Sequence, residues 1–235
     1  MKKIGLLGGL SPESTVEYYK IINSEVRKVL GGCSSAELVI ESFNFREIEK
    51  MQFEGKWDEL GEKLGLAAQK LEQAGAKNIV ICTNLMHKVA PQVQKHISVP
   101  LIHMVDCVAK ELKKFRINKV GLLGTIFTME EDFYSKKLLD NYNIETIIPN
   151  KSDRQEVSRV IYEELCCGII KPESKKRYLE IIDKMKEQGA QGVILGCTEI
   201  PLMINEASIP VLNTTKVHAM SVVEKILEDY LVRAT

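Results

Sequence analysis

The sequence of 235 residues lacks an excess of charge of either sign, because 32 lysine and arginine residues balance 32 aspartate and glutamate residues. A balanced chain gives no electrostatic reason to expect nucleic acid or an anionic membrane as a partner. No apolar run reaches the ~20 residues that a bilayer-spanning helix needs, and no signal-like apolar segment follows Met1. We therefore expect a cytoplasmic protein that binds neither nucleic acid nor membrane.

Signatures of the common bound groups are also missing. Gly5, Gly8 and Gly9 do not form the GxGxxG fingerprint of dinucleotide-binding proteins, and no GxxxxGK[ST] phosphate loop occurs. The six cysteines include no CxxC pair, and the four histidines lack the spacing of a metal site. In a chain of this length without a signal segment, reduced thiols are expected rather than disulfides. The sequence thus predicts no cofactor and no metal.

Short apolar runs alternate with longer helical stretches along the chain. Ser11 is expected to cap the first helix, with Pro12 at its first position. Thr128, three residues before Glu131, has the spacing of another helix start. The expected strands cover residues 4–7, 36–42, 78–82 and 100–103, and the expected helices include 11–30, 56–73 and 216–231. This alternation is typical of parallel sheets joined by crossover helices.

The second half of the chain repeats the first at an offset of about 110–116 residues. The matched segments are residues 3–8 with 119–124, 74–76 with 188–190, 82–83 with 197–198, and 98–101 with 208–211. The repeat predicts an α/β fold of two pseudo-symmetric open-sheet domains, with mainly parallel strands flanked by helices. We expect residues 1–98 and 212–235 to form the first domain and residues 99–211 the second. Functional loops at the carboxyl ends of the strands would then meet in an interdomain cleft.

Cys82 is the first candidate catalytic residue, because it directly follows the apolar run of residues 79–81, where a buried strand is expected to end. A thiol at the start of a following helix would have a lowered pKa. Thr83 and Asn84 add a hydroxyl and an amide, beside backbone N–H groups suited to a carboxylate. Taken alone, a buried structural cysteine is the commoner interpretation.

A second cysteine favours a catalytic over a structural role, because Cys197 and Thr198 occupy the position of the repeat that matches Cys82 and Thr83. Two opposed sulfurs suit racemisation: a thiolate removes a proton from one face of a stereocentre and a thiol returns one to the other. No cofactor is needed where fixed donors stabilise the developing enolate. Glu199 would orient Thr198, assist Cys197 or only cap the next helix.

Three segments resemble the aspartate/glutamate racemase family: Gly8–Thr15 (GGLSPEST), Cys82–Lys88 (CTNLMHK) and Gly196–Ile200 (GCTEI). The likeness extends over essentially the whole chain. The glutamate after the second Cys-Thr is similar to the aspartate-racemase branch rather than to the cell-wall glutamate racemases. The resemblance implies a two-domain, cofactor-independent amino-acid racemase that works as a homodimer, with Cys82 and Cys197 as its acid–base pair.

The resemblance also implies which residues contact the substrate. Those expected to line the pocket are Leu10, Gln52, Thr83, Asn84, Leu85, Thr125 and Thr198, and Arg46 matches an arginine that holds a side-chain carboxylate in aspartate-specific members. The lysine that assists this arginine has no counterpart in Glu164–Cys167. Aspartate or glutamate is therefore one expectation, and a broader range that includes neutral polar amino acids is another.

Two other functions remain open from the sequence. A single-thiol decarboxylase or cis–trans isomerase on the same scaffold would need only one of the two cysteines. A non-catalytic amino-acid sensor would keep the pocket without the chemistry. The two matched cysteines favour racemisation, because a one-sided reaction needs one proton shuttle.

Overall fold

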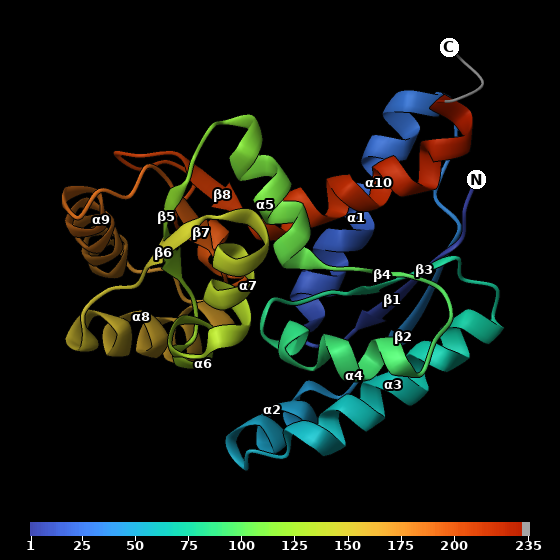
Figure 1. Cartoon of the computed structure of the whole chain (residues 1–235), viewed down its shortest axis with the longest axis horizontal. Coiled ribbons are helices and arrows are strands. Elements are labelled where there is room, and N and C mark those ends of the chain that lie inside the picture. Colours follow the sequence, from blue (N-terminus) through green and yellow to red (C-terminus); the bar gives the residue numbers. More distant parts are fainter. Residues whose placement is uncertain (232–235) are drawn as a thin grey trace. The chain divides into compact units, whose positions relative to one another are not determined.

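The computed structural model describes residues 1–231, which form two compact units (Figure 1). Unit 1 comprises residues 1–104 and the chain from His218 onward, and unit 2 comprises residues 105–217. Each boundary falls after the fourth strand of a sheet, a few residues later than the expected divisions at 98/99 and 211/212. Residues 232–235 of the expected first domain lie outside the described residues.

Unit 1 is built on a parallel sheet with the strand order β2-β1-β3-β4. Its strands are β1 (Ile4–Gly8), β2 (Leu38–Ser42), β3 (Asn78–Ile81) and β4 (Leu101–Ile102). β1 and β3 are buried along their whole length, as expected for central parallel strands covered on both faces. The expected strands at these four places are confirmed, with ends shifted by up to two residues.

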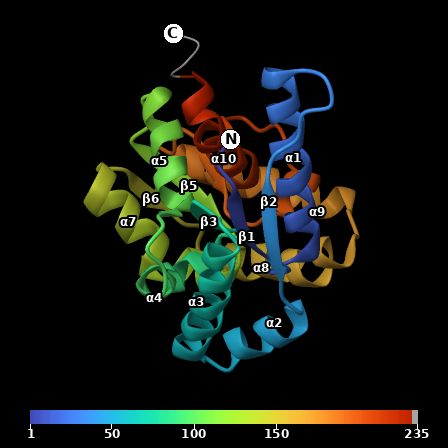
Figure 2. The same ribbon diagram turned by 90° about the vertical axis from the view of Figure 1, so that its right-hand side faces the viewer.

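Helices cover both faces of this sheet (Figure 1, Figure 2). The helices between its strands are α1 (Pro12–Leu30), α2 (Phe45–Phe53), α3 (Trp57–Gln73), the 3-10 helix η1 (Leu85–Val89) and α4 (Ala90–Lys95). Ser11 caps α1 as expected, since its side chain accepts a hydrogen bond from the backbone N–H of Ser14. The apolar core between α3 and the sheet includes Leu7, Leu64 and Ile79.

Unit 2 repeats this plan with the strand order β6-β5-β7-β8, again wholly parallel. Its strands are β5 (Lys119–Leu123), β6 (Glu145–Ile147), β7 (Val193–Leu195) and β8 (Val211–Asn213). Its helices are α6 (Ile126–Glu130), α7 (Asp132–Tyr142), α8 (Lys151–Glu163), η2 (Leu165–Cys167), α9 (Pro172–Glu187) and η3 (Ile200–Leu202). The identical strand order in the two units confirms the predicted pseudo-symmetry.

Two helices follow the fourth strands and join the units. α5 (Met104–Lys114) begins at the last residue of the first segment of unit 1, and α10 (Thr214–Leu231) enters unit 1 at His218. Within unit 1, α10 contacts α1, because the hydroxyl of Tyr18 lies 2.7 Å from Nδ1 of His218. α10 therefore packs against α1 in unit 1.

Two local expectations need correction. Thr125, and not Thr128, caps α6, and its side chain accepts a hydrogen bond from the backbone N–H of Thr128. In both units the helix that follows the first strand thus begins with a hydroxyl cap, Ser11 for α1 and Thr125 for α6. Helix α2 was not expected from the sequence, although Asn44 is its cap and accepts a hydrogen bond from the N–H of Arg46.

Candidate active site

The strand order fixes where each unit offers a ligand site. In an open α/β sheet the crevice lies at the carboxyl ends of the strands where the chain turns to opposite sides. Here the neighbours at that point are β1 and β3 in unit 1 and β5 and β7 in unit 2. Cys82 directly follows β3, and Cys197 lies two residues after β7. The two thiols therefore occupy equivalent switch points.

The backbone of Cys82 is held on both sides. Its N–H donates to the Leu7 carbonyl at 3.0 Å, and its own carbonyl accepts from the Ser14 hydroxyl at 2.7 Å. Because the side chain is 0% exposed, burial raises the pKa of the Cys82 thiol. The expectation of a lowered pKa is thus wrong for this structure, in which only the short η1 follows the strand and desolvation dominates.

Cys197 has a carboxylate beside it. Its Sγ donates to Oε2 of Glu199 at 2.9 Å, and the Thr198 hydroxyl donates to the same oxygen at 2.8 Å. Glu199 is 6% exposed, so this contact lies largely outside solvent. Burial first, and then the Glu199 charge and hydrogen bond, raise the pKa of the Cys197 thiol. The sulfur of Cys197 is therefore a thiol that keeps its proton.

Comparison with known proteins identifies the group to which this arrangement belongs. Residues 7–222 match the Asp/Glu/Hydantoin racemase family. The chain belongs to that family. A crystal structure of a putative Asp/Glu racemase from Yersinia pestis is 46% identical, with a TM-score of 0.92 over 97% of this chain and 100% of that chain.

Two further relatives are an aspartate racemase homologue and an amino-acid racemase. An aspartate racemase homologue from Pyrococcus horikoshii is 38% identical, with a TM-score of 0.84 over 96% of this chain and 99% of that chain. The broad specificity amino-acid racemase RacX of Bacillus subtilis is 24% identical over 95% of this chain and 98% of that protein. The likeness to each of these proteins covers nearly the whole chain.

In this family member, most residues expected to line the substrate pocket of unit 1 lie at one edge of its sheet. Thr83 and Asn84 follow Cys82, Leu85 begins η1, and Leu10 follows β1. Gln52 joins them from α2, since its amide nitrogen lies 3.1 Å from Sδ of Met86 on η1. Leu10, Gln52, Asn84 and Leu85 are buried, whereas Thr83 retains partial exposure.

Arg46 behaves differently from those residues. It begins α2 after β2, its side chain is exposed, and no carboxylate of the described residues pairs with its guanidinium. An unpaired arginine at the edge of a candidate site is available to an anionic group of a ligand.

The unit-2 residues gather in the same way. Thr125 follows β5, and Thr198 and Glu199 follow Cys197. β5 and β7 approach closely here, because Gly196 N–H donates to the Leu123 carbonyl at 2.6 Å. A Cβ on Gly196 would lie 2.9 Å from that carbonyl oxygen. The absence of a side chain at Gly196 therefore allows the strand end to carry Cys197 beside the end of β5.

The segment that lacks the expected lysine, residues 164–167, contains a buried carboxylate and two cysteines. The Glu164 carboxylate is buried and accepts hydrogen bonds from Arg159 at 2.9 Å, Lys171 at 3.3 Å and Ser174 at 2.6 Å. The Ser174 hydroxyl and the two cations lower the pKa of Glu164. Cys166, which follows it in η2, is exposed. Lys171 is thus engaged by Glu164, and a thiol stands near the place of the missing cation.

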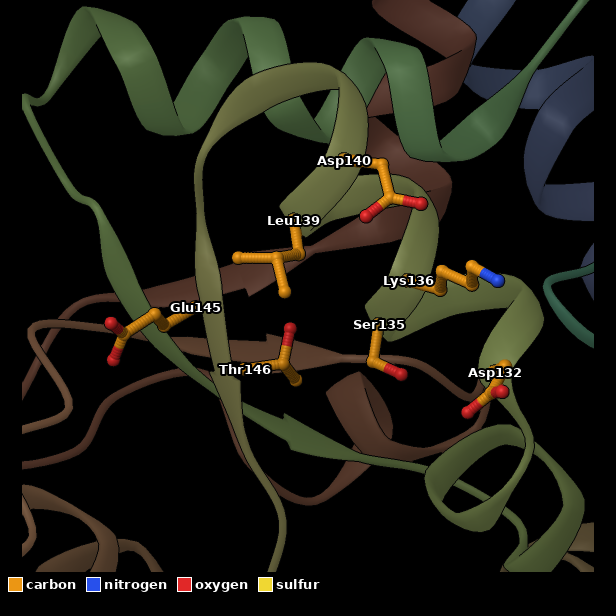
Figure 3. A pocket seen from close by; sticks show the side chains of 7 residues that line it. All are labelled: Asp132, Ser135, Lys136, Leu139, Asp140, Glu145 and Thr146. Atoms are coloured by element: carbon orange, nitrogen blue, oxygen red, sulfur yellow. The ribbon is translucent and has the colours of Figure 1, made fainter.

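A separate surface hollow of about 530 Å³ lies along α7 and the edge strand β6 (Figure 3). Its lining residues include Asp132, Lys136, Asp140 and Thr146, and neither Cys82 nor Cys197 is among them. The α7 residues of this hollow recur at helical spacing, so it is a groove beside the exposed face of one helix. We do not assign the chemistry of the thiols to it.

Within residues 1–231, no group of three or more histidine, cysteine, aspartate or glutamate side chains is arranged to hold a metal ion. No helix in the same part of the chain is both long and apolar enough to cross a membrane.

One residue near the thiols, Ser14, was not identified from the sequence, and it holds the Cys82 carbonyl from α1. His87, about one turn beyond Cys82, was expected to have a structural or supporting role, and its ring lies within hydrogen-bond distance of the Thr83 carbonyl. For Ser14 the signal was weak, because a serine three residues after an N-cap serine is usually an ordinary first-turn residue.

Proposed function

We propose that this protein racemises an amino acid without a cofactor, with Cys82 and Cys197 acting on opposite faces of the α-carbon. The observation that carries this proposal is the pair of thiols at equivalent switch points of two units with the same strand order. Membership of the Asp/Glu/Hydantoin racemase family supports it. A reaction on one face would need only one of these thiols.

The difference between the two thiols suggests how a cycle begins. Glu199 keeps the proton on Cys197, whereas burial alone raises the pKa of Cys82. The ammonium group of a bound amino acid is a positive charge that would lower the pKa of Cys82 and favour its thiolate. In this proposal the Cys82 thiolate removes the α-proton, and the Cys197 thiol donates its proton to the other face. The reverse reaction exchanges these roles.

The enolate formed in between needs hydrogen-bond donors at the substrate carboxylate. The donors that we propose for this role are the backbone N–H groups of Thr83, Asn84 and Leu85 at the start of η1. The hydroxyls of Thr83 and Thr198 directly follow the two cysteines in the sequence. Fixed donors in a buried site stabilise developing negative charge without reorganisation, and each typically contributes about 3–4 kcal/mol.

The substrate range follows from the charges around the two thiols. Arg46 is an unpaired cation that suits the side-chain carboxylate of aspartate or glutamate. No second cation is provided by Cys166, whose side chain is a thiol, or by Lys171, which is engaged by Glu164. We propose that the enzyme accepts aspartate or glutamate and also neutral polar amino acids. RacX, a similar protein, carries the name of a broad specificity racemase.

The experiment that tests this function is α-proton exchange in D₂O, followed by NMR and optical rotation. Purified protein would receive L- and D-amino acids with no added cofactor. Exchange with loss of optical activity is expected. Exchange without racemisation, or decarboxylation or isomerisation of a test acid, would favour the single-thiol alternatives, and binding without exchange would favour a sensor.

We also propose a cytoplasmic homodimer, whose mass is measurable by sedimentation.

A further inference from the structure

Three histidines gather in unit 1 behind the loop that carries Cys82. They are His87 on η1, His103 between β4 and α5, and His218 on α10. The ring centroid of His87 lies 4.7 Å from that of His103 and 5.6 Å from that of His218. His87 is 2% exposed and His218 is 0% exposed. Buried polar groups need hydrogen-bond partners, so the partners reveal the state of each ring.

The partners of His87 fix its tautomer. A carbonyl oxygen only accepts, so Nδ1 of His87, 2.8 Å from the Thr83 carbonyl, must carry the proton. Nε2 accepts from the backbone N–H of Met104 at 3.0 Å and must lack one. If the ring were protonated, its Nε2–H would point at the backbone N–H of Met104, and neither group could accept a hydrogen bond. The neutral ring therefore joins the residue after Cys82 to the start of α5.

His218 continues the same network. Its Nε2 donates to the Ile102 carbonyl at 2.8 Å, and its Nδ1 accepts from the Tyr18 hydroxyl at 2.7 Å. Met104 is the last residue before the chain leaves unit 1, and His218 is the residue at which it returns. The network thus holds the two points at which the chain leaves and re-enters unit 1 against the core of that unit.

We infer that His87 is a positioning residue for Cys82, which fixes the Thr83 peptide by donating a hydrogen bond from Nδ1 to its carbonyl. The inference rests on the proposed function, because Cys82 is the thiol to be positioned. Ser14 holds the preceding carbonyl, that of Cys82 itself, at 2.7 Å. Two consecutive carbonyls are thereby held by side chains from α1 and η1. The N–H groups that follow them, at Asn84 and Leu85, are the donors proposed for the substrate.

The groups that face His87 keep its ring neutral. They are His103 and His218, with Tyr18 beyond His218, and no carboxylate is among the contacts described for the ring. Burial, together with repulsion from the two neighbouring histidines, lowers the pKa of His87 well below its ordinary value. The ring is therefore suited to hold a backbone geometry rather than to shuttle protons near neutral pH.

Two substitutions separate the two hydrogen bonds of the ring. The amide of His87→Asn lies near the position of Nδ1 and retains a donor for the Thr83 carbonyl. The amide of His87→Gln lies near the position of Nε2 and retains an acceptor for Met104. Unfolding followed by fluorescence of Trp57, the single tryptophan of the chain, reports the stability of unit 1 for both variants.

If the two variants lose the same amount of unfolding free energy, we expect His87→Gln to lower kcat by about 100-fold with little change in KM, because a catalytic group is then misplaced. His87→Asn should keep most of the wild-type kcat. Equal kcat losses in the two variants, or a larger loss in His87→Asn, would overturn the inference.

Alkylation by iodoacetamide, located by mass spectrometry, tests the inference without using racemisation. Cys82 should react faster in His87→Gln than in the wild type and in His87→Asn. Cys107, buried in unit 2, should react at an unchanged rate and so controls for general unfolding. If the wild type shows no α-proton exchange while these rates behave as expected, the proposed function fails and the positioning role stands. Unchanged Cys82 reactivity in His87→Gln would contradict the role itself.

Discussion

Acid should weaken unit 1 through His218, and the size of the effect follows from its surroundings. Burial lowers the pKa of His218 from 6.5 to about 4, although the hydrogen bond from its ring to the Ile102 carbonyl acts in the opposite direction. An unfolded chain binds a proton at this histidine once the pH falls below 6.5, whereas the folded chain resists it until about pH 4. The contribution of His218 to the free energy of unfolding is thus fully present above pH 6.5 and is lost as the pH falls toward 4.

The magnitude comes from the two pKa values. Their difference, 6.5 − 4 = 2.5, corresponds to roughly 3 kcal/mol, because one pH unit is worth 1.36 kcal/mol. At pH 5 the loss relative to pH 7 should already be about 2 kcal/mol. His87 has the same sign of dependence, since its pKa is also lowered.

The assay compares the wild type with His218→Gln, which does not titrate in this range. Urea unfolding followed by Trp57 fluorescence at pH 7 and pH 5 gives the unfolding free energy of unit 1. The variant should be less stable at pH 7 by ~1–3 kcal/mol, because Tyr18 loses its acceptor. The difference between the two proteins should then shrink by about 2 kcal/mol at pH 5. A difference that stays constant between these pH values would refute the reasoning.

Three further predictions concern other parts of the chain. Glu199→Gln should lower the pKa of Cys197, seen as faster iodoacetamide alkylation of Cys197 at neutral pH, because the carboxylate that retains its proton is removed; an unchanged rate would contradict the pairing. Gly9→Ala should destabilise unit 1 by at least ~2 kcal/mol more than Gly55→Ala in urea unfolding. Both glycines have positive φ, but a Cβ on Gly9 would lie 2.2 Å from the Phe43 carbonyl, and one on Gly55 would meet nothing within 4 Å; equal losses would exclude the clash. Racemisation should be unaffected by EDTA or by added pyridoxal phosphate, and a large loss on chelation would reveal a required metal.

Much of the fold was predictable because the sequence contains an internal repeat, so that each half supports the prediction made for the other. The repeated segments and the alternation of apolar runs and helices predicted two parallel α/β units, and the strand orders confirm this. A period of over 100 residues is a strong signal, since it fixes many strand positions together. The missed helix α2 has only nine residues, so few helical turns were present in the sequence from which to predict it.

Local chemistry was harder to predict than topology. The sequence located Cys82 at a strand end, but the pKa of its thiol depends on how completely neighbours bury it, which no local pattern encodes. The contacts of Glu199 with Cys197 and Thr198 are local, and both were among the three roles expected for Glu199. The bonds of His87 and His218 join residues 17 and 200 positions apart, to Met104 and Tyr18. Such contacts depend on packing between elements that are distant in the chain.

The most direct test of the two-thiol mechanism compares Cys82→Ser and Cys197→Ser with the wild type in D₂O. Each variant should lose racemisation by ~10²-fold or more while it stays folded. Any residual α-proton exchange should involve opposite enantiomers in the two variants, because each retains the thiol on one face. Near-normal racemisation by either variant, or exchange of the same enantiomer by both, would contradict the account.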